Sequence, residues 1–281
     1  MKRILIFILC ALLLSGCSGT APSPIAAPTA APTAEPTPSP FPTVYVEKGM
    51  ATVIDLDGDG EKEQIEIETV QLNEYMEYHT VRVTDGELVQ RAGETMIASS
   101  PRITLTDLDG DRVPEILLSG DVASDDYVTY ACRWTSNGLQ AISFSGEVRS
   151  DVSSGAFVDG GVDTAENGTV MLGSHLFMLG TYQGYRPYEL KEDGSIGPVE
   201  DSIWVFRGNE FWMETAMDLS EELPAGTKLR LTGADGVAQV WYVTEDGRQG
   251  SLTLSESEDK WGWCINGVHE LECFVELPYA G

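Results

Sequence analysis

The amino-acid sequence predicts an all-β fold of short antiparallel strands, for three reasons. Segments such as Ile65–Glu68 and Val81–Thr84 alternate apolar with polar residues, which is the period of a half-buried strand. Almost every such segment after Val44 ends at a turn rich in Gly, Asp or Asn. One acidic spacing also occurs twice, beginning at Asp55 and at Asp107, which indicates a structural repeat of 52 residues.

Residues 1–16 have the proportions of a signal peptide. Lys2 and Arg3 precede Ile4–Leu14, an apolar run of 11 residues that is too short to span a bilayer. The run closes in Leu-Ser-Gly-Cys17, which resembles the lipobox of bacterial lipoproteins. This resemblance implies cleavage before Cys17, lipidation of its sulfur, and anchoring at the extracytoplasmic face of the cell membrane. An ordinary secretory signal with an incidental cysteine is the alternative.

Residues 17–43 are expected to form a tether rich in Pro, Ala and Thr. Eight of the 14 prolines lie between Pro22 and Pro42. Such a segment cannot bury apolar surface and favours extended polyproline-II geometry. At about 3.1 Å per residue, it would hold a domain roughly 70–80 Å from the membrane.

The charge of the chain excludes several kinds of partner. Removing residues 1–16 leaves 15 basic against 45 acidic residues, a net charge of −30. Nucleic-acid binding depends on Lys and Arg that neutralise phosphates, so we expect no nucleic-acid partner. Adhesion to anionic lipid head groups is disfavoured for the same reason. The composition suits an extracytoplasmic protein whose charge is partly masked by divalent cations.

Residues 44–212 are predicted to hold about three repeats of blade-like antiparallel sheets. Four strands per 52-residue unit is the content of one propeller blade. The third unit is expected to begin at Asp159–Asp163, where the acidic pattern is degenerate. Closed propellers usually need at least four blades, so an open stack, or a blade completed from elsewhere, fits the length better. The predicted strands lie near 64–70, 77–84, 87–92, 102–106, 115–119, 127–135, 139–143, 169–172, 186–190 and 203–206.

Residues 213–281 are expected to form a separate small β-barrel domain. Turn signals recur at Ala234–Gly236, Glu245–Gly247 and Asn266–Gly267. Residues 223–254 resemble bacterial SH3-like barrels, although the Gly-Trp-Val that usually follows the hairpin is replaced here by Gly-Ser-Leu. The resemblance implies a sharply bent, closed barrel.

Three cysteines remain in this expected mature domain: Cys132, Cys264 and Cys273. An odd number without paired spacing is not a disulfide framework. A bridge between Cys264 and Cys273 is one alternative, but a two-residue turn at Asn266–Gly267 would place Cys264 opposite His269 instead.

The repeated acidic segments predict a metal site. Loop one (Asp55–Glu63) and loop two (Asp107–Glu115) each carry carboxylates at positions 1, 3, 5 and 9 and glycine at position 4. Carboxylates crowded on a short loop repel one another unless a cation lies among them. Several hard oxygen ligands on one flexible loop are typical of Ca²⁺ sites.

An EF-hand explains these loops less well. Loop one fits the EF-hand spacing up to Glu66. However, the flanking residues predict strands where an EF-hand needs helices. Loop two also has Leu118 in place of the twelfth-position glutamate, and Arg112 where the turn calls for glycine.

The shared strand–loop–strand pattern resembles the FG-GAP/VCBS repeats, whose Asp-x-Asp-Gly-Asp-Gly-x-x-Asp/Glu motif binds Ca²⁺ at the rim of propeller blades. The resemblance implies one or two structural Ca²⁺ ions, with an affinity in the extracellular range of roughly 10⁻⁴–10⁻³ M. Arg112 makes loop two the weaker candidate, since a left-handed turn without glycine costs about 1 kcal/mol. The implied ligands are Asp55, Asp57, Asp59, Glu63 and the Glu61 carbonyl, and Asp107, Asp109, Asp111, Glu115 and the Val113 carbonyl.

We expect a binding protein and no enzyme, since the sequence contains no motif for nucleophilic, metal-hydrolase or phosphate chemistry. Aromatic residues are the candidate contacts for a cell-envelope glycan or protein. They are Tyr182, Tyr185 and Tyr188 in an expected loop, and Trp261 and Trp263, which would share a face if extended. An extracytoplasmic hydrolase acting on envelope polymers is the alternative function. A solute-binding protein fits poorly without alternating strands and helices.

Overall fold

The structure is a computed structural model. It describes residues 41–71, 77–86, 88–92, 99–123, 126–146, 150–151, 156–158, 160–166, 168–258 and 260–279. The expected signal peptide, Cys17 and nearly all of the expected tether lie outside the described residues. Ser39–Gly281 form one compact unit by their contacts. In its described part, no helix is long and apolar enough to cross a membrane.

The first sheet is an antiparallel meander of four strands in chain order. Its side chains alternate along the two central strands between buried and more exposed positions, so only one face of the sheet is covered. The four strands expected in the first repeat, ending with the one near 102–106, are all found. The strands of this sheet are β2 (Ala51–Ile54), β3 (Glu63–Gln71), β4 (Glu77–Asp85) and β5 (Leu88–Ala92).

The second sheet has the same meander at its centre, β6 to β9, with one strand added before it and two after it. Every residue from Pro114 to Gly120 is buried, so this sheet is covered on both faces. The sheet consists of β1 (Val44–Glu47), β6 (Ser99–Thr106), β7 (Glu115–Ala123), β8 (Asp126–Thr135), β9 (Gly138–Ile142), β10 (Ser150–Asp151) and β11 (Ala156–Val158).

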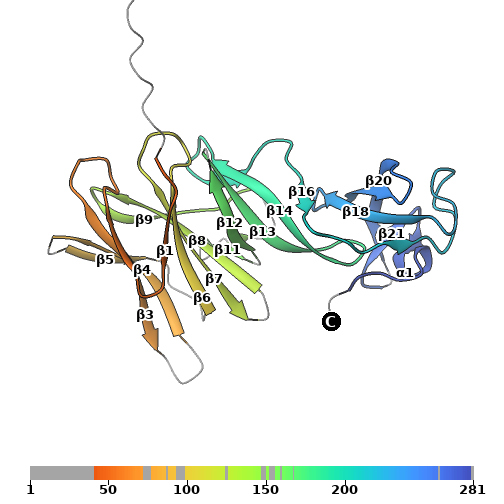
Figure 1. The fold of residues 1–281 in the computed structure, drawn as a ribbon, viewed down its shortest axis with the longest axis horizontal. Coiled ribbons are helices and arrows are strands. Elements are labelled where there is room, and N and C mark those ends of the chain that lie inside the picture. Colours follow the sequence, from red (N-terminus) through yellow and green to blue (C-terminus); the bar gives the residue numbers. More distant parts are fainter. Residues whose placement is uncertain are drawn as a thin grey trace, which may run out of the picture. The chain divides into compact units, whose positions relative to one another are not determined.

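Consecutive sheets pack face to face. Ile65 and Val83 of the first sheet share a core with Ile103, Ile116 and Trp134 of the second. Residues on the opposite face of the second sheet, Leu117 and Ala131, share a different core with the third sheet. The sheets therefore stack in chain order (Figure 1).

The third sheet runs through the C-terminal region without closing into a barrel. It contains 11 strands, and the two at its ends, β12 and β22, each have a neighbour on one side only. The all-β prediction is confirmed, but the closed SH3-like barrel is wrong. The strands and helix are β12 (Gly160–Glu166), β13 (Thr169–Phe177), β14 (Thr181–Leu190), β15 (Ile196–Pro198), β16 (Trp204–Phe206), β17 (Met213–Glu214), β18 (Lys228–Ala234), β19 (Gln239–Thr244), β20 (Gln249–Glu256), β21 (Trp263–Ile265), β22 (Val268–His269) and α1 (Glu270–Cys273).

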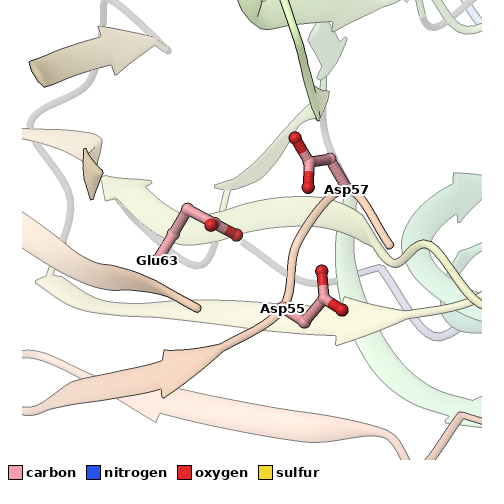
Figure 2. A group of neighbouring side chains, drawn as sticks. All are labelled: Asp55, Asp57 and Glu63. Atoms are coloured by element: carbon pink, nitrogen blue, oxygen red, sulfur yellow. The ribbon is translucent and has the colours of Figure 1, made fainter. Parts of the chain in front are cut away.

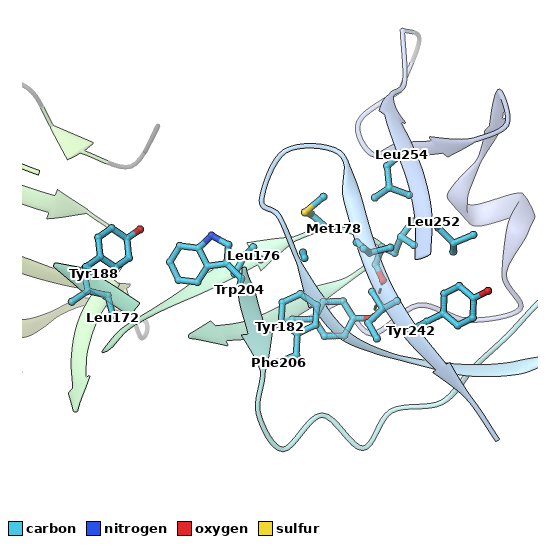
Figure 3. Packing of buried hydrophobic residues seen from close by; sticks show 14 of the residues in the cluster. Leu172, Leu176, Met178, Tyr182, Tyr188, Trp204, Phe206, Tyr242, Leu252 and Leu254 are labelled. Carbon is cyan, nitrogen blue, oxygen red and sulfur yellow. Dashed lines mark hydrogen bonds between the residues drawn. The ribbon is translucent and has the colours of Figure 1, made fainter. Parts of the chain in front are cut away.

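The sheet and its core continue across residue 212, the boundary suggested by the sequence. Trp204 on β16 pairs with Ala234 on β18. Figure 3 shows the core extending from Tyr188 and Leu172, past Trp204, to Tyr242 and Leu254. The third repeat and the C-terminal strands thus share one hydrophobic core.

The third repeat differs from the prediction in its loop. The 52-residue period places an acidic loop at 159–163, but Gly160–Glu166 is strand β12, and Asp159 lies outside the described residues. β12 and β13 are consecutive antiparallel strands, with Glu166 at the end of β12 opposite Thr169 at the start of β13. No nine-residue acidic loop therefore separates these two strands, and the third repeat keeps only the strands.

The three cysteines are free. Cys264 lies opposite His269 in the β21–β22 hairpin, which confirms the predicted register. Burial raises the pKa of the Cys132 thiol to about 12. The pKa of Cys273 is raised to about 11, first by burial and then by the neighbouring Cys264.

A thiol reagent at neutral pH is expected to modify Cys264 in the native protein while sparing Cys132 and Cys273. The thiolate is the reactive form, and two of the three thiols are buried with raised pKa values. All three should react in denaturant, and mass spectrometry of peptides would show the order. Native labelling of Cys132 as fast as Cys264 would contradict the structure.

Candidate functional site

The two acidic loops have the same internal hydrogen bonding, position by position. In each, the position-1 carboxylate accepts from the backbone N–H groups of positions 4 and 6. The position-9 glutamate accepts from the N–H of position 2. The distances are 2.7 Å (Asp55–Gly58), 3.1 Å (Asp55–Gly60) and 2.7 Å (Glu63–Leu56) in loop one, and 2.7 Å (Asp107–Gly110), 2.9 Å (Asp107–Arg112) and 2.7 Å (Glu115–Leu108) in loop two.

The aspartates at positions 3 and 5 also repeat their contacts. Each accepts from the backbone N–H two residues later, an arrangement known as an Asx turn. These bonds are Asp57–Asp59 at 3.4 Å, Asp59–Glu61 at 2.7 Å, Asp109–Asp111 at 3.2 Å and Asp111–Val113 at 2.7 Å. Glu61 and Val113 thus occupy equivalent places, and a ligand role for their carbonyls remains a prediction.

The loops lie next to each other and help to join the sheets. A Cβ on Gly58 of loop one would be 3.3 Å from Val113 of loop two. The position-2 leucines are buried: Leu56 in the core between the first and second sheets, and Leu108 in the core of the third. Ordering of either loop therefore also holds two neighbouring sheets together.

Position 6 is left-handed in both loops, with φ 93° at Gly60 and 73° at Arg112. The strain predicted at Arg112 is confirmed by this conformation, since a side chain there meets the following carbonyl. Arg112→Gly is expected to stabilise the protein by about 0.5–1 kcal/mol.

Denaturant unfolding at high salt would measure this effect with the lost charge of Arg112 screened. Gly60→Ala places the opposite change at the equivalent position and should destabilise the protein by about 1 kcal/mol. Destabilisation by Arg112→Gly would contradict the assigned conformation.

Loop one gathers its carboxylates into a set that suits a hard cation. Oxygens of Asp55, Asp57 and Glu63 lie within 4.8 Å of one another. Figure 2 shows that the two aspartates come from the loop and the glutamate from the strand that follows it. Burial raises the pKa of Glu63, and the charges of Asp57 and Asp55 add to the effect although the Leu56 N–H opposes it. An added cation would remove this electrostatic cost.

Loop two differs because a protein cation reaches into it. Oxygens of Asp107, Asp109 and Asp111 lie within 4.8 Å, but Glu115 is not part of this set. Arg133 on β8 bonds Glu115 Oε1 through Nε at 3.0 Å and Asp109 Oδ2 through Nη2 at 2.9 Å. Two of the four predicted ligands are thus paired with a guanidinium.

This ion pair changes the acidity of the loop. Burial alone would raise the pKa of Asp109, but hydrogen bonds from Arg133 and the Asp111 N–H outweigh it, and the net shift is downward. The pKa of Glu115 is raised by burial, which the bonds from Arg133 and Leu108 only partly offset. Asp111 has a raised pKa from burial and from the nearby charge of Asp109.

Strands flank both loops, which rules out EF-hand architecture. Ile54 ends β2 directly before loop one, and Glu63, the last residue of loop one, begins β3. Glu66, the twelfth residue of an EF-hand reading, lies on β3 and forms an ion pair with Arg82 of β4. Its carboxylate is therefore engaged in a cross-strand ion pair and does not serve as the twelfth-position ligand of an EF-hand.

The tyrosine segment is not a loop, so that prediction is wrong. Tyr182, Tyr185 and Tyr188 all lie on strand β14. Tyr182 and Tyr188 are buried, and Tyr182 stacks on Phe206 with ring centroids 4.7 Å apart. They have no surface to offer a ligand, whereas Tyr185 faces the other side of the strand.

The two tryptophans do not form a flat extended pair. Gly262 between them has φ 123°, outside the extended region. The Trp263 indole N–H donates to the Phe177 carbonyl at 2.6 Å. Trp261 is 72% exposed and lies against Tyr279, with ring centroids 5.5 Å apart. Of the pair, Trp261 alone offers a largely open ring.

A cleft of about 620 Å³ lies where the second and third sheets meet. Two tyrosine rings rest on glycines there: a Cβ would be 2.9 Å from Tyr127 at Gly161 and 3.0 Å from Tyr185 at Gly173. Arg207 covers Tyr185 at 4.8 Å from the ring centroid, while Tyr127 is 39% exposed. The polar lining includes Glu47, Arg102, Ser119, Asp163, His175 and Gln183.

Sequence reasoning found one cleft residue, Tyr185, and missed Tyr127. Tyr127 lies on β8, and the sequence around it predicts a strand but gives no sign of a binding site. The signal available was Gly160-Gly161, since consecutive glycines inside a strand leave room for a neighbouring ring.

Comparisons with known proteins give no relatives: no family model matches the chain, and neither a curated protein nor a solved structure is detectably similar.

Proposed function

We propose that this protein is a Ca²⁺-binding, lipid-anchored extracytoplasmic lipoprotein that acts as a binding or adhesion module for a cell-envelope glycan or protein. The main observation in support of Ca²⁺ binding is the repeated loop geometry. Two segments 52 residues apart adopt the same carboxylate-to-backbone network. The FG-GAP/VCBS resemblance supports the choice of Ca²⁺, and the sequence before residue 44 supports the anchor.

The loop one residues fit the proposed ion. Asp55, Asp57 and Glu63 supply converging carboxylates, and Asp59 is held nearby by its bond to the Glu61 N–H. Bound Ca²⁺ would supply positive charge and oxygen coordination, without redox or acid–base chemistry. The loop connects β2 to β3 and buries Leu56 against the second sheet, so its ordering would stabilise the packing of the first two sheets.

The cleft between the second and third sheets is the proposed ligand site. Tyr127 offers a partly open ring, and carboxylate, guanidinium, amide and imidazole groups surround it. Aromatic faces beside planar polar groups suit sugars and peptides. The cleft is open to solvent and bounded by strands of two sheets, so it would accept an extended, chain-like ligand.

Tyr127→Ala is expected to weaken binding to isolated cell-envelope material about tenfold, or ~1.4 kcal/mol. Tyr78→Ala is the matched control, because Tyr78 is exposed to a similar extent, 37% against 39%, but lies on the first sheet away from the cleft. Binding would be followed by co-sedimentation of the purified protein with envelope preparations. Equal binding by both variants would remove the cleft from the proposal.

The hydrolase hypothesis is tested with the same samples. Envelope polymers incubated with the purified protein would release soluble fragments if it turned them over. We expect binding without release, and fragments that appear with wild type but not with Tyr127→Ala would favour the enzyme.

A further inference from the structure

We propose that Arg133 takes the place of a metal ion in loop two, so that the protein holds a single Ca²⁺, in loop one. The inference rests on the proposed Ca²⁺ site for its first half. Its second half, that loop two is neutralised by the protein's own guanidinium, depends only on contacts within loop two and β8.

The guanidinium bridges the two ends of loop two. Nε donates to Glu115 Oε1 at 3.0 Å, and Nη2 donates both to that oxygen and to Asp109 Oδ2, the latter at 2.9 Å. Asp109 is position 3 and Glu115 position 9, so the cation joins carboxylates that a metal ion would otherwise bring together. A planar guanidinium with several fixed donors is well suited to such bridging.

Glu115 has no uncommitted oxygen left. Oε2 accepts the Leu108 N–H at 2.7 Å, Oε1 accepts from Arg133, and the side chain is fully buried. A metal ion that used all four predicted carboxylates of loop two would have to displace Arg133 from both Asp109 and the buried Glu115. Breaking a buried ion pair is costly because one charge is left without a partner. The carboxylates therefore stay with the guanidinium.

Loop one has no such partner among the residues that the structure describes. Glu63 Oε2 accepts the Leu56 N–H just as in loop two. Within the described ranges, however, no lysine or arginine pairs with a loop one carboxylate. The carboxylates at positions 1, 3, 5 and 9 of loop one therefore depend on a cation from solution.

The strand register explains the difference. Arg133 lies directly opposite Glu115 across β7 and β8. In the first sheet, the pairing of β3 with β4 ends at Gln64 and Thr84, and the residue that follows Thr84 on β4 is Asp85. The equivalent position therefore carries an arginine in the second repeat and an aspartate in the first. The two loops therefore differ: Arg133 neutralises loop two, whereas loop one is available to a metal ion.

Titration calorimetry of Ca²⁺ into chelator-treated protein tests the stoichiometry. We expect one ion per chain for wild type and two for Arg133→Gln. Arg82→Gln is the matched control: it removes an arginine that pairs with a glutamate across β3 and β4, away from both loops, and should still bind one ion. Two ions in wild type, or one ion in both wild type and a folded Arg133→Gln, would overturn the proposal.

Hydrogen exchange on the unmutated protein tests the same idea if Arg133→Gln does not fold. Chelator should increase exchange in loop one peptides at least tenfold and leave loop two peptides unchanged. Equal loss of protection in both loops would overturn the proposal. If wild type binds no ion but Arg133→Gln binds one, the Ca²⁺ site at loop one fails while the role of Arg133 stands. If neither binds Ca²⁺, both proposals are overturned.

Discussion

Millimolar Ca²⁺ is expected to raise the melting temperature of the chelator-treated protein by roughly 5–10 °C. An ion present at about 100 times its dissociation constant stabilises the folded state by about 2.7 kcal/mol, and 10 mM Ca²⁺ reaches this ratio for a site of ~10⁻⁴ M. Each kcal/mol shifts the melting temperature of a domain of this size by about 2–4 °C. Scanning calorimetry with Ca²⁺ and with chelator would measure the shift.

The shift should disappear in Asp57→Asn, which removes one of the three converging carboxylates. Asp201→Asn is the control, because it makes the same chemical change at an exposed turn where φ is 57°, a conformation that Asn tolerates. An undiminished Ca²⁺ shift in Asp57→Asn would place the ion elsewhere. Loss of the shift in Asp201→Asn would show that the Ca²⁺-induced change in melting temperature depends on the overall negative charge and not on a specific site.

Trp204→Ala is expected to destabilise the protein by about 3–5 kcal/mol, the usual cost of removing a buried large aromatic side chain. Trp204 is 1% exposed, and its strand joins the third repeat to the C-terminal strands. The loss should therefore affect residues on both sides of position 212. Trp212→Ala is the control: that side chain is 40% exposed and should change stability far less.

Two buried cysteines report the effect separately. Cys132 lies on the second sheet and Cys273 in the C-terminal helix. Thiol labelling across a denaturant series would give an unfolding midpoint at each site. We expect Trp204→Ala to lower the midpoint at Cys273 substantially. An unchanged midpoint there would mean that residues 213–281 fold as the independent domain suggested by the sequence.

The strands were predictable because their signals are local. β3 and β4 alternate apolar and polar residues, and the turns between C-terminal strands carry Asp-Gly or Asn-Gly. The loop geometry was equally local, since positions 1, 3 and 5 bond to backbone within the same nine residues. Even the left-handed turn at Arg112 followed from its alignment with Gly60.

A strand was predicted near 186–190, the second half of β14, but the tyrosines were expected in a loop. Gly184 and Pro187 lie in this segment. Gly184 has a packing reason to be in β14, and Pro187 is accommodated in the strand. A Cβ on Gly184 would be 2.3 Å from Leu176 Cδ1, so the glycine permits close packing. Pro187 lies opposite Met171 in the β13–β14 pairing. Tertiary packing, which a local pattern does not contain, decided the conformation.

The partner of loop two could not be read from spacing. Arg133 is 18 residues from Glu115, and the contact exists only because β7 and β8 pair in one register. A shift of one residue would turn Arg133 to the other face of the sheet. The position of the third acidic loop was mispredicted for a related reason. β12 and β13 pair directly without a nine-residue loop between them, so the acids that would mark the repeat are missing.

A crystal structure of the protein grown in millimolar Ca²⁺ would test the central claim most directly. We predict one ion in loop one, bound by oxygens of Asp55, Asp57, Asp59 and Glu63 at about 2.3–2.6 Å, with Arg133 still paired to Glu115 in loop two. Crystals that show loop one without an ion, and its carboxylates turned toward solvent, would contradict the account.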